Sequence, residues 1–394
     1  MISSCSGRST RSVTGRRTLG PSSFRAAALS LAVLLITSAV AACGSSTGSP
    51  ASSSTPSIAG TASAHPVTLA PGSFTTTGTM SSRYFHTATL LKDGRVLIAG
   101  GCCANTNALA TAEIYAPASG TFTQTGAMSV GRYFHTANLL PDGRVLIAGG
   151  FNETGPLSSA ELYDPQTGQF TRTGSMARVR SQHTATTLKD GRILLAGGTP
   201  GGNTAELYDE TTGKFVDTGT MSAVRFGHTA TLLNDGTVLI AGGEQSQYTA
   251  EIFHPLTGRF TAMTARLNAG RFLHTATLLK DGTVLLNGGS PGRTSSEIFD
   301  PATSQFTTTS SMNVGRYYHT ATLLSNGSVL IAGGWPTEPS AEIFDPVQRE
   351  YNPTKSMVYG RSRQTATLLA NGTVLIAGGA GGFDGAAPAE LFRP

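Results

Sequence analysis

The sequence predicts an all-β fold built from seven copies of one unit, and three observations support this prediction. A stretch that reads RYFHTANLLPDGRVLIAGG at 132–150 recurs, with 45 to 49 residues between equivalent positions. Each copy contains two short apolar runs joined by Asp-Gly or Asn-Gly, the strongest short-range signal for a β-hairpin. A period of this size is typical of supersecondary units in an array or ring, and not of one ordinary domain.

Each unit is predicted to form four antiparallel strands. The first strand follows Arg-x-x-His, and the second ends at Gly-Gly; both are nearly continuous in apolar residues and are expected to be buried on two faces. After a loop of variable length comes a third strand such as 160–163, whose alternation indicates a more peripheral position. Asp164-Pro165 ends that strand because proline cannot continue the pairing, and a fourth strand is marked by Phe170.

The seventh unit lacks a fourth strand of its own. It stops at 389–394, whereas 72–80, at the other end of the chain, matches the fourth strand of the first unit at 120–128. An open row of sheets would leave unpaired edges. We therefore expect the N-terminal strand to complete the last sheet and to close a ring of seven blades, a β-propeller.

The order of motifs in the unit resembles the kelch repeat, which forms β-propellers. The resemblance rests on Gly-Gly, then Glu-x-Tyr-Asp-Pro, then an aromatic residue and a Met before the next unit, and it covers about 72–394. It implies a seven-bladed propeller of kelch type in a domain at 67–394. Kelch units usually carry Trp on the fourth strand; here Phe or Tyr351 is expected to fill the same apolar role.

The first 66 residues are predicted to be a targeting segment and a tether. Residues 1–42 carry five arginines, no acidic residue and an apolar run at 26–42, the pattern of a signal peptide. Val-Ala-Ala-Cys at 40–43 resembles the lipobox of bacterial lipoproteins, which implies that Cys43 becomes the lipidated first residue; an ordinary secretory signal is the alternative. Residues 43–66 are rich in Ser, Thr, Gly, Ala and Pro and are expected to be flexible.

These features predict an exported protein, anchored by lipid to the bacterial cell membrane or outer membrane, with the propeller in the extracytoplasmic space. The net charge of +5 is carried by the five arginines before Cys43, so the remainder is neutral. A neutral domain has no electrostatic footprint for a phosphate backbone, which argues against a nucleic-acid partner. We expect a monomer that touches the membrane through its anchor only.

Cys102 and Cys103 are the only cysteines after Cys43. Adjacent cysteines in an oxidising compartment could form a strained disulfide, stay free, or bind a soft metal. A local disulfide that stiffens the loop is the favoured interpretation. A thiolate zinc site is not expected because there is no second Cys pair.

One face of the ring is predicted to carry the binding residues. The second strand returns to the level at which the first begins, so each variable loop lies beside an Arg-x-x-His element, while the Asp-Gly turns lie on the opposite face. Loops on a rigid scaffold are the usual carriers of function. The candidates in the loops are Trp335, Phe151 and Glu244. The candidates at the repeat positions are Arg83, Arg132, Arg180, Arg225, Arg271, Arg316, Arg361, His86, His135, His183, His228, His274 and His319.

The arginines and histidines also have a structural interpretation. Each unit has one Glu on its third strand, so Arg-Glu pairs within or between blades are expected, and these are favoured over anion binding. The glutamates are Glu113, Glu161, Glu206, Glu251, Glu297, Glu342 and Glu390. Each His is expected to hydrogen-bond a neighbouring blade near the central channel. The alternative is that two or three of them bind a transition metal.

The rival functional hypothesis is an enzyme. Galactose oxidase and related copper-radical oxidases also have a kelch-like propeller of seven blades, and Tyr317-Tyr318-His319 is similar to the Tyr-His part of their site. That resemblance would make Tyr318 and His319 catalytic, with copper as cofactor. In that family a Cys is cross-linked to the Tyr, whereas this chain has no Cys at the start of a first strand. We therefore expect a binding module without a metal or cofactor, whose ligand is a glycan, a peptide or a protein.

Overall fold

The computed structural model describes residues 72–102, 107–381 and 388–394. The predicted signal peptide, Cys43, the tether and Cys103 lie outside these residues, so those predictions stay predictions. The described residues are all β, with no helix; none of them therefore forms an apolar helix of the length needed to cross a membrane.

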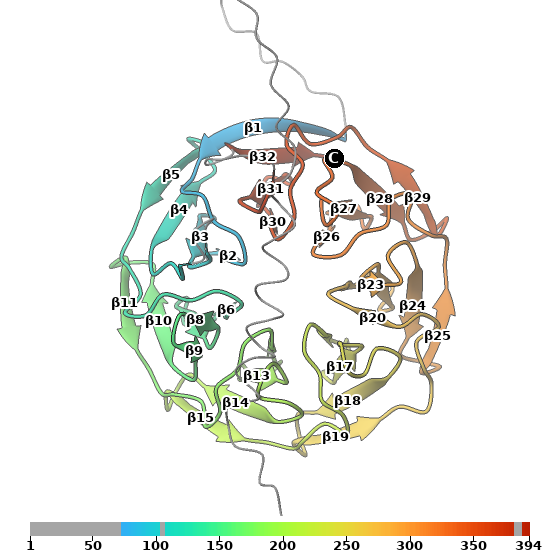
Figure 1. Ribbon diagram of the computed structural model, residues 1–394, viewed down its shortest axis with the longest axis horizontal. Helices are drawn as coiled ribbons and strands as arrows, with labels where there is room; N and C mark the ends of the chain where they lie inside the picture. The colour runs from blue at the N-terminus through green and yellow to red at the C-terminus, as the bar shows by residue number, and fades with distance from the viewer. Residues whose placement is uncertain (1–71, 103–106, 382–387) are drawn as a thin grey trace, which may run out of the picture. The chain divides into compact units, whose positions relative to one another are not determined.

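Seven four-stranded antiparallel sheets form a propeller ring, as predicted (Figure 1). The innermost strands are β2 (Thr87–Leu90), β6 (Thr136–Leu139), β12 (Thr184–Thr187), β16 (Thr229–Leu232), β21 (Thr275–Leu278), β26 (Thr320–Leu323) and β30 (Thr365–Leu368). The second strands are β3 (Val96–Ala99), β7 (Val145–Ala148), β13 (Ile193–Ala196), β17 (Val238–Ala241), β22 (Val284–Asn287), β27 (Val329–Ala332) and β31 (Val374–Ala377).

The outer half of each blade consists of the third and fourth strands. The third strands are β4 (Ala112–Ala116), β10 (Ala160–Asp164), β14 (Ala205–Asp209), β18 (Ala250–His254), β24 (Ser296–Asp300), β28 (Ala341–Asp345) and β32 (Pro388–Arg393). The fourth strands are β5 (Thr121–Gln124), β11 (Gln169–Arg172), β15 (Lys214–Asp217), β19 (Arg259–Ala262), β25 (Gln305–Thr308), β29 (Glu350–Pro353) and β1 (Ser73–Thr79). Two short pairs lie in the loops: β8 (Phe151–Asn152) with β9 (Gly155–Pro156), and β20 (Arg271–Phe272) with β23 (Ser290–Pro291).

The N-terminal strand closes the ring in the predicted place. β1 pairs with β32, with Ser73 opposite Arg393 and Thr76 opposite Glu390. It also contacts the first blade, because the N–H of Gly78 donates to Gly120 O. The last blade therefore consists of the two ends of the chain.

The hydrophobic core is divided into seven clusters, each shared by two neighbouring blades. The second strands are buried at every residue, as predicted. On the outer strands an aromatic pair packs in each blade, for example Tyr163 and Phe170 with ring centroids 4.8 Å apart. Phe and Tyr351 thus fill the apolar role expected of them.

The burial of the first and third strands differs from the prediction. The first strands are mostly half-buried because they are innermost and border the central channel. The third strands are buried over four residues or nearly so, because fourth strands and neighbouring blades cover them. Their alternation arises from the Glu that each one carries into the interior.

Candidate functional site

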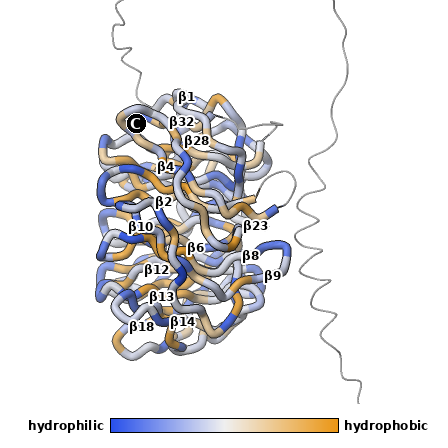
Figure 2. The backbone as a smooth tube through the Cα atoms, turned by 90° about the vertical axis from the view of Figure 1, so that its left-hand side faces the viewer, coloured by the Kyte–Doolittle hydropathy of each residue, from blue (hydrophilic) through white to orange (hydrophobic). Residues whose placement is uncertain are grey.

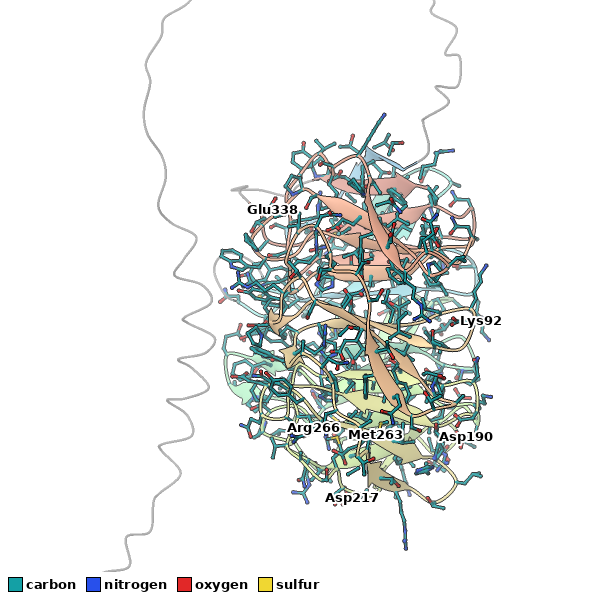
Figure 3. All side chains as sticks on the ribbon, turned by 90° about the vertical axis from the view of Figure 1, so that its right-hand side faces the viewer. Lys92, Asp190, Asp217, Met263, Arg266 and Glu338 are labelled. Carbon is teal, nitrogen blue, oxygen red and sulfur yellow. The ribbon has the colours of Figure 1, made fainter. Side chains whose placement is uncertain are left out.

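The variable loops lie on one face of the ring, and we call this the loop face. Tyr84 forms a β-bridge with Cys102, and Tyr317 forms one with Trp335, so each loop starts beside an Arg-x-x-His element. Figure 3 places Lys92 and Asp190, from the Asp-Gly turns, at one edge and Glu338, from a loop, at the opposite edge. The predicted division into a loop face and a turn face is confirmed.

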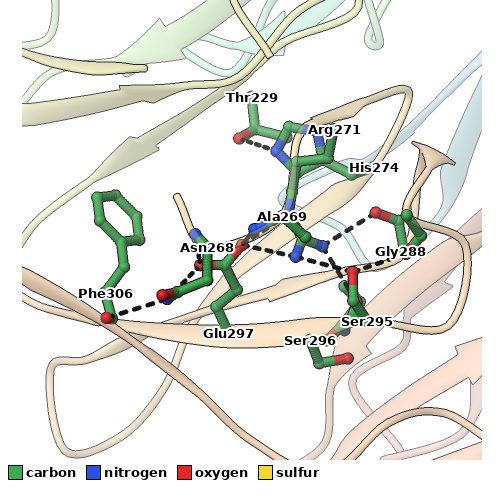
Figure 4. Close-up of polar contacts among 12 residues, drawn as sticks. Thr229, Asn268, Ala269, Arg271, His274, Gly288, Ser295, Ser296, Glu297 and Phe306 are labelled. Carbon is green, nitrogen blue, oxygen red and sulfur yellow. Dashed lines mark hydrogen bonds and ion pairs between the residues drawn. The ribbon is translucent and has the colours of Figure 1, made fainter. Parts of the chain in front are cut away.

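All seven repeat arginines form buried ion pairs within their own blades. Arg271 donates from Nη2 to Glu297 Oε1 at 2.7 Å, and from Nη1 to the carbonyls of Gly288 and Ser295 (Figure 4). Glu297 in turn accepts from the backbone N–H of Asn268 and Ala269. The pairs are Arg83–Glu113, Arg132–Glu161, Arg180–Glu206, Arg225–Glu251, Arg271–Glu297, Arg316–Glu342 and Arg361–Glu390.

The guanidinium groups therefore support the loops from the interior of the blades. Their side chains are at most 2 % exposed, so they do not lie on the surface. Each clamps the two ends of its loop to the Glu on the third strand, which is the structural role that the equal counts of Arg and Glu suggested. Burial lowers the pKa of Arg271, and the Glu297 carboxylate acts in the opposite direction.

The six histidines and Gln364 connect neighbouring blades around the channel. Nε2 of His135 bonds Thr87 Oγ1 of the preceding blade at 3.0 Å, and Gln364 donates to Ala332 O. The ring of His135 packs so closely on Gly100 that a Cβ there would lie 2.7 Å from Cε1. This contact, together with a φ of 64°, explains the first Gly of that Gly-Gly pair.

Desolvation keeps the histidines neutral. Burial lowers the pKa of His86, His183, His228 and His319 to about 3, and the nearby arginines act in the same direction. Nδ1 of all six is buried without a hydrogen-bond partner. Interblade packing thus accounts for the repeated His.

The residues that directly precede the six histidines and Gln364 form a ring of their own around the channel. The sequence analysis did not predict it. These seven residues are Phe85, Phe134, Gln182, Gly227, Leu273, Tyr318 and Arg363, one from each blade. All of them have φ between 53° and 61°, the left-handed region that non-glycine residues seldom adopt. We call them the mouth ring, because they line an open cavity of about 320 Å³ at the central channel.

Backbone hydrogen bonds run round the mouth ring without a break. The N–H of Phe134 donates to Phe85 O at 3.3 Å, that of Phe85 donates to Arg363 O at 3.3 Å, and the series returns through every blade. Each bond joins two neighbouring blades. This circuit satisfies polar backbone groups that strands cannot reach and offsets the cost of the left-handed conformation.

Aromatic side chains spread outward from the mouth ring across the loop face. Ring centroids lie 3.9 Å apart for Phe85 and Phe134, and 5.3 Å apart for Phe134 and Tyr133. On the other side of Phe85 the contacts continue to Tyr318 at 5.3 Å and from Tyr318 to Tyr317 at 5.6 Å. We call the connected series the aromatic stripe; its members are Phe151, Tyr133, Phe134, Phe85, Tyr84, Tyr318 and Tyr317.

The predicted loop candidates lie beside or within the stripe. Phe151, on β8, contacts Tyr133 at 5.6 Å, and β8 and β9 project on the same side as β23 in Figure 2. Trp335 is half-buried where its backbone pairs with Tyr317. Glu244 is half-buried in the loop of blade four, and burial raises the pKa of its carboxyl.

Tyr318 and His319, the pair singled out for the copper alternative, both have contacts within the propeller. Nε2 of His319 is bonded to Thr275 Oγ1 at 3.0 Å, and the Tyr318 ring packs against Phe85 and the Arg363 guanidinium. Burial raises the pKa of Tyr318 well above its ordinary value, which favours the neutral phenol. No group of three or more His, Cys, Asp or Glu that could hold a metal ion occurs in the described parts of the chain.

The comparisons with known proteins concern the repeat and the fold. The family description "Kelch motif" matches residues 134–177, which are the second unit from the mouth ring to the start of the third. This unit matches the kelch motif. Because the other six units share its register and strand order, the chain forms a seven-bladed propeller of kelch type. A search of curated proteins found no match.

Among solved structures, a fungal alcohol oxidase of the AA5 family in complex with copper is similar to this chain. The TM-score is 0.69 at 17 % sequence identity, over 82 % of this chain and 76 % of the oxidase. At this identity the similarity concerns the kelch propeller fold. Copper binding and alcohol oxidation are stated of that oxidase, and a shared fold does not by itself assign them to this chain.

Proposed function

We propose that this kelch propeller is a binding module that takes an extended glycan on the aromatic stripe of its loop face. The observation that carries the proposal is the continuous series of half-buried aromatic rings across the channel mouth. Sugar rings present flat C–H faces, which pack on the negative faces of aromatic rings, while their hydroxyl groups remain hydrated. Rigid aromatic side chains also lose little conformational entropy on binding.

A peptide ligand is less well matched to this face. Extended peptides are commonly held by adding a strand to an exposed sheet edge. The exposed edges here are the fourth strands, which lie at the outer rim and are largely exposed, away from the mouth. The loop face instead offers ring surfaces, and these suit a ligand recognised by stacking.

The proposal extends to the location of the protein. Export by the segment at 1–42 and lipidation of Cys43 would place the glycan-binding face outside the cytoplasmic membrane, at the end of the tether 43–66. The support for this is the signal-peptide pattern and the lipobox resemblance in the sequence. A ligand at the cell envelope follows from that location.

Two variants with opposite expectations test the binding surface. Tyr133→Ala removes the ring that connects Phe151 to Phe134 and is expected to weaken glycan binding about tenfold, the usual scale for a large aromatic contact. Leu256→Ala removes an apolar side chain that is 100 % exposed in the turn after β18, outside the stripe, and should leave binding unchanged. The assay is retention of the purified full-length protein on immobilised polysaccharides.

Trp335→Ala is a further test of the same face. If both Tyr133→Ala and Trp335→Ala bind as the unchanged protein does, while the thermal unfolding midpoint stays constant, the ligand does not occupy the stripe. Equal loss in Leu256→Ala would show that binding to the polysaccharide is nonspecific.

A further inference from the structure

Arg363 differs from the other arginines of the repeat. It is the one charged member of the mouth ring; the equivalent residues are Phe, Phe, Gln, Gly, Leu and Tyr. Arg361, two residues earlier, is paired with Glu390, and the turn arginine Arg95 is paired with Asp93. Within the described residues no carboxylate forms an ion pair with Arg363, and its Nε is buried without a hydrogen-bond partner.

Aromatic rings hold the guanidinium of Arg363 at the cavity. Its central carbon lies 5.0 Å from the ring centroid of Phe85 and 5.2 Å from that of Tyr318. Such contacts attract the cation and keep it beside the two rings. The N–H donors lie in the plane of the group, and that geometry matches a carboxylate, which can accept two parallel hydrogen bonds.

A second cation stands at the far end of the tyrosine pair. The guanidinium of Arg293, which is exposed, lies over Tyr317 at 5.3 Å. The two arginines therefore flank Tyr317 and Tyr318, so each end of this part of the stripe carries one positive charge. That arrangement suits a ligand that combines apolar ring faces with single negative charges at intervals.

We propose that the mouth ring is a carboxylate subsite, and that the ligand is a glycan containing uronic acid. Arg363 binds the carboxylate of one sugar unit in the channel mouth, while Phe85, Phe134 and Tyr318 pack on the ring of that unit. This inference rests on the proposed glycan-binding function and names the substrate class. A neutral glycan would leave the half-buried guanidinium without an anion, whereas a uronate supplies one.

The experiment compares oligosaccharides that differ only in charge. Hexamers of galacturonate, glucuronate and mannuronate are each titrated calorimetrically into the full-length protein beside the same hexamer as its methyl ester. At least one acid is expected to bind about tenfold or more tightly than its ester, the difference for one hydrogen-bonded ion pair. Arg363→Gln is expected to abolish that difference, so that acid and ester bind this variant with equal affinity.

The chain supplies the matched control for this substitution. Gln182 occupies the equivalent mouth-ring position in blade three with φ of 53°, close to the 61° of Arg363, so glutamine is compatible with that backbone. Arg363→Lys keeps the charge but loses the bidentate geometry, and an intermediate preference for the acid is expected. Circular dichroism and thermal unfolding establish that both variants fold.

Failure of this inference can be told apart from failure of the proposed function. Equal binding of acid and ester by the unchanged protein, or an acid preference that survives in Arg363→Gln, overturns the carboxylate subsite. If acid and ester bind equally and Tyr133→Ala weakens the binding of both, the proposed glycan-binding function of the stripe is still supported. Absence of binding to any oligosaccharide or polysaccharide, with binding of a peptide or protein instead, overturns both.

Discussion

The buried pair of Arg271 and Glu297 permits a sharp test of how the loop face is supported. The change is Glu297→Gln, which keeps the size of the side chain and removes its charge. Both partners are at most 1 % exposed, so the remaining guanidinium would stay buried with a net charge. Besides Arg271, the carboxylate serves the N–H groups of Asn268 and Ala269, and an amide cannot accept through its nitrogen.

The expected loss in the free energy of unfolding is large because the ion pair is buried away from water. Breaking a buried ion pair by removing one partner costs about 3–5 kcal/mol. The free energy of unfolding of a typical domain is about 5–15 kcal/mol, so a single side chain would account for a third or more of it. The measurement is the free energy of unfolding from urea titration, followed by intrinsic fluorescence and by circular dichroism.

A matched surface pair serves as the control. Asp190 and Arg192 form an ion pair whose side chains are 44 % and 35 % exposed, and exposed pairs contribute about 1 kcal/mol or less. Asp190→Asn should therefore change the free energy of unfolding by less than about 1 kcal/mol. In the double variant Arg271→Met with Glu297→Gln, the orphaned charge is absent, so its loss should be smaller than the sum of the two single losses.

The result that would refute this reasoning is a loss below about 1 kcal/mol for Glu297→Gln, equal to that of Asp190→Asn. Strict additivity in the double variant would point to the same conclusion. Either outcome would mean that water reaches the pair, and the ring of arginines would then be open to ligands.

Three further predictions concern pH, ring closure and anchoring. Because the folded-state pKa of His319 is about 3, below the unfolded value near 6.5, its stabilising effect is complete above pH 6.5 and is lost as pH falls from there toward 3. The free energy of unfolding should therefore drop between pH 7 and 5. The drop should be smaller in His319→Gln, a variant that places at this position the residue found at Gln364. An equal dependence of the free energy on pH in the two proteins would contradict this prediction. Deletion of 72–80 removes β1 and its pairing with β32, so the thermal unfolding midpoint should fall by an amount equivalent to several kcal/mol. An unaltered midpoint would show that β1 does not close the ring. Cys43→Ala should move the protein from the membrane fraction to the soluble fraction, and persistent membrane association would rule out the lipid anchor.

The fold could be read from the sequence because its causes are local and repeated. Asp-Gly and Asn-Gly pairs mark the hairpins. The extra strand at 72–80 supplies the fourth strand that the seventh unit lacks. The Arg-Glu pairing followed from one Arg and one Glu per unit. The burial of the first strands was predicted wrongly, because an apolar run does not reveal that one of its faces borders a channel.

The mouth ring could not be derived from sequence rules. Propensity reserves positive φ for glycine, and of the seven positions only Gly227 meets that rule. Phe85 and Tyr318 adopt the same conformation because partners in neighbouring blades fix it, and such long-range hydrogen bonds leave no mark in a local window. One signal was available: of the two positions between the repeated Arg and the nearly constant His, the second varies most widely, from Phe to Gly to Arg.

The circuit of backbone hydrogen bonds has a consequence for the electric field at the channel. A helix end concentrates charge because its peptide dipoles are parallel. In the mouth ring the dipoles follow one another round a circle, so they cancel and add almost no potential on the axis. The sign of the charge that a ligand meets there is consequently set by side chains alone, with Arg363 foremost. Since those side chains take no part in the circuit, the same backbone already carries Phe, Gln, Gly, Leu, Tyr and Arg, and selectivity can change independently of architecture.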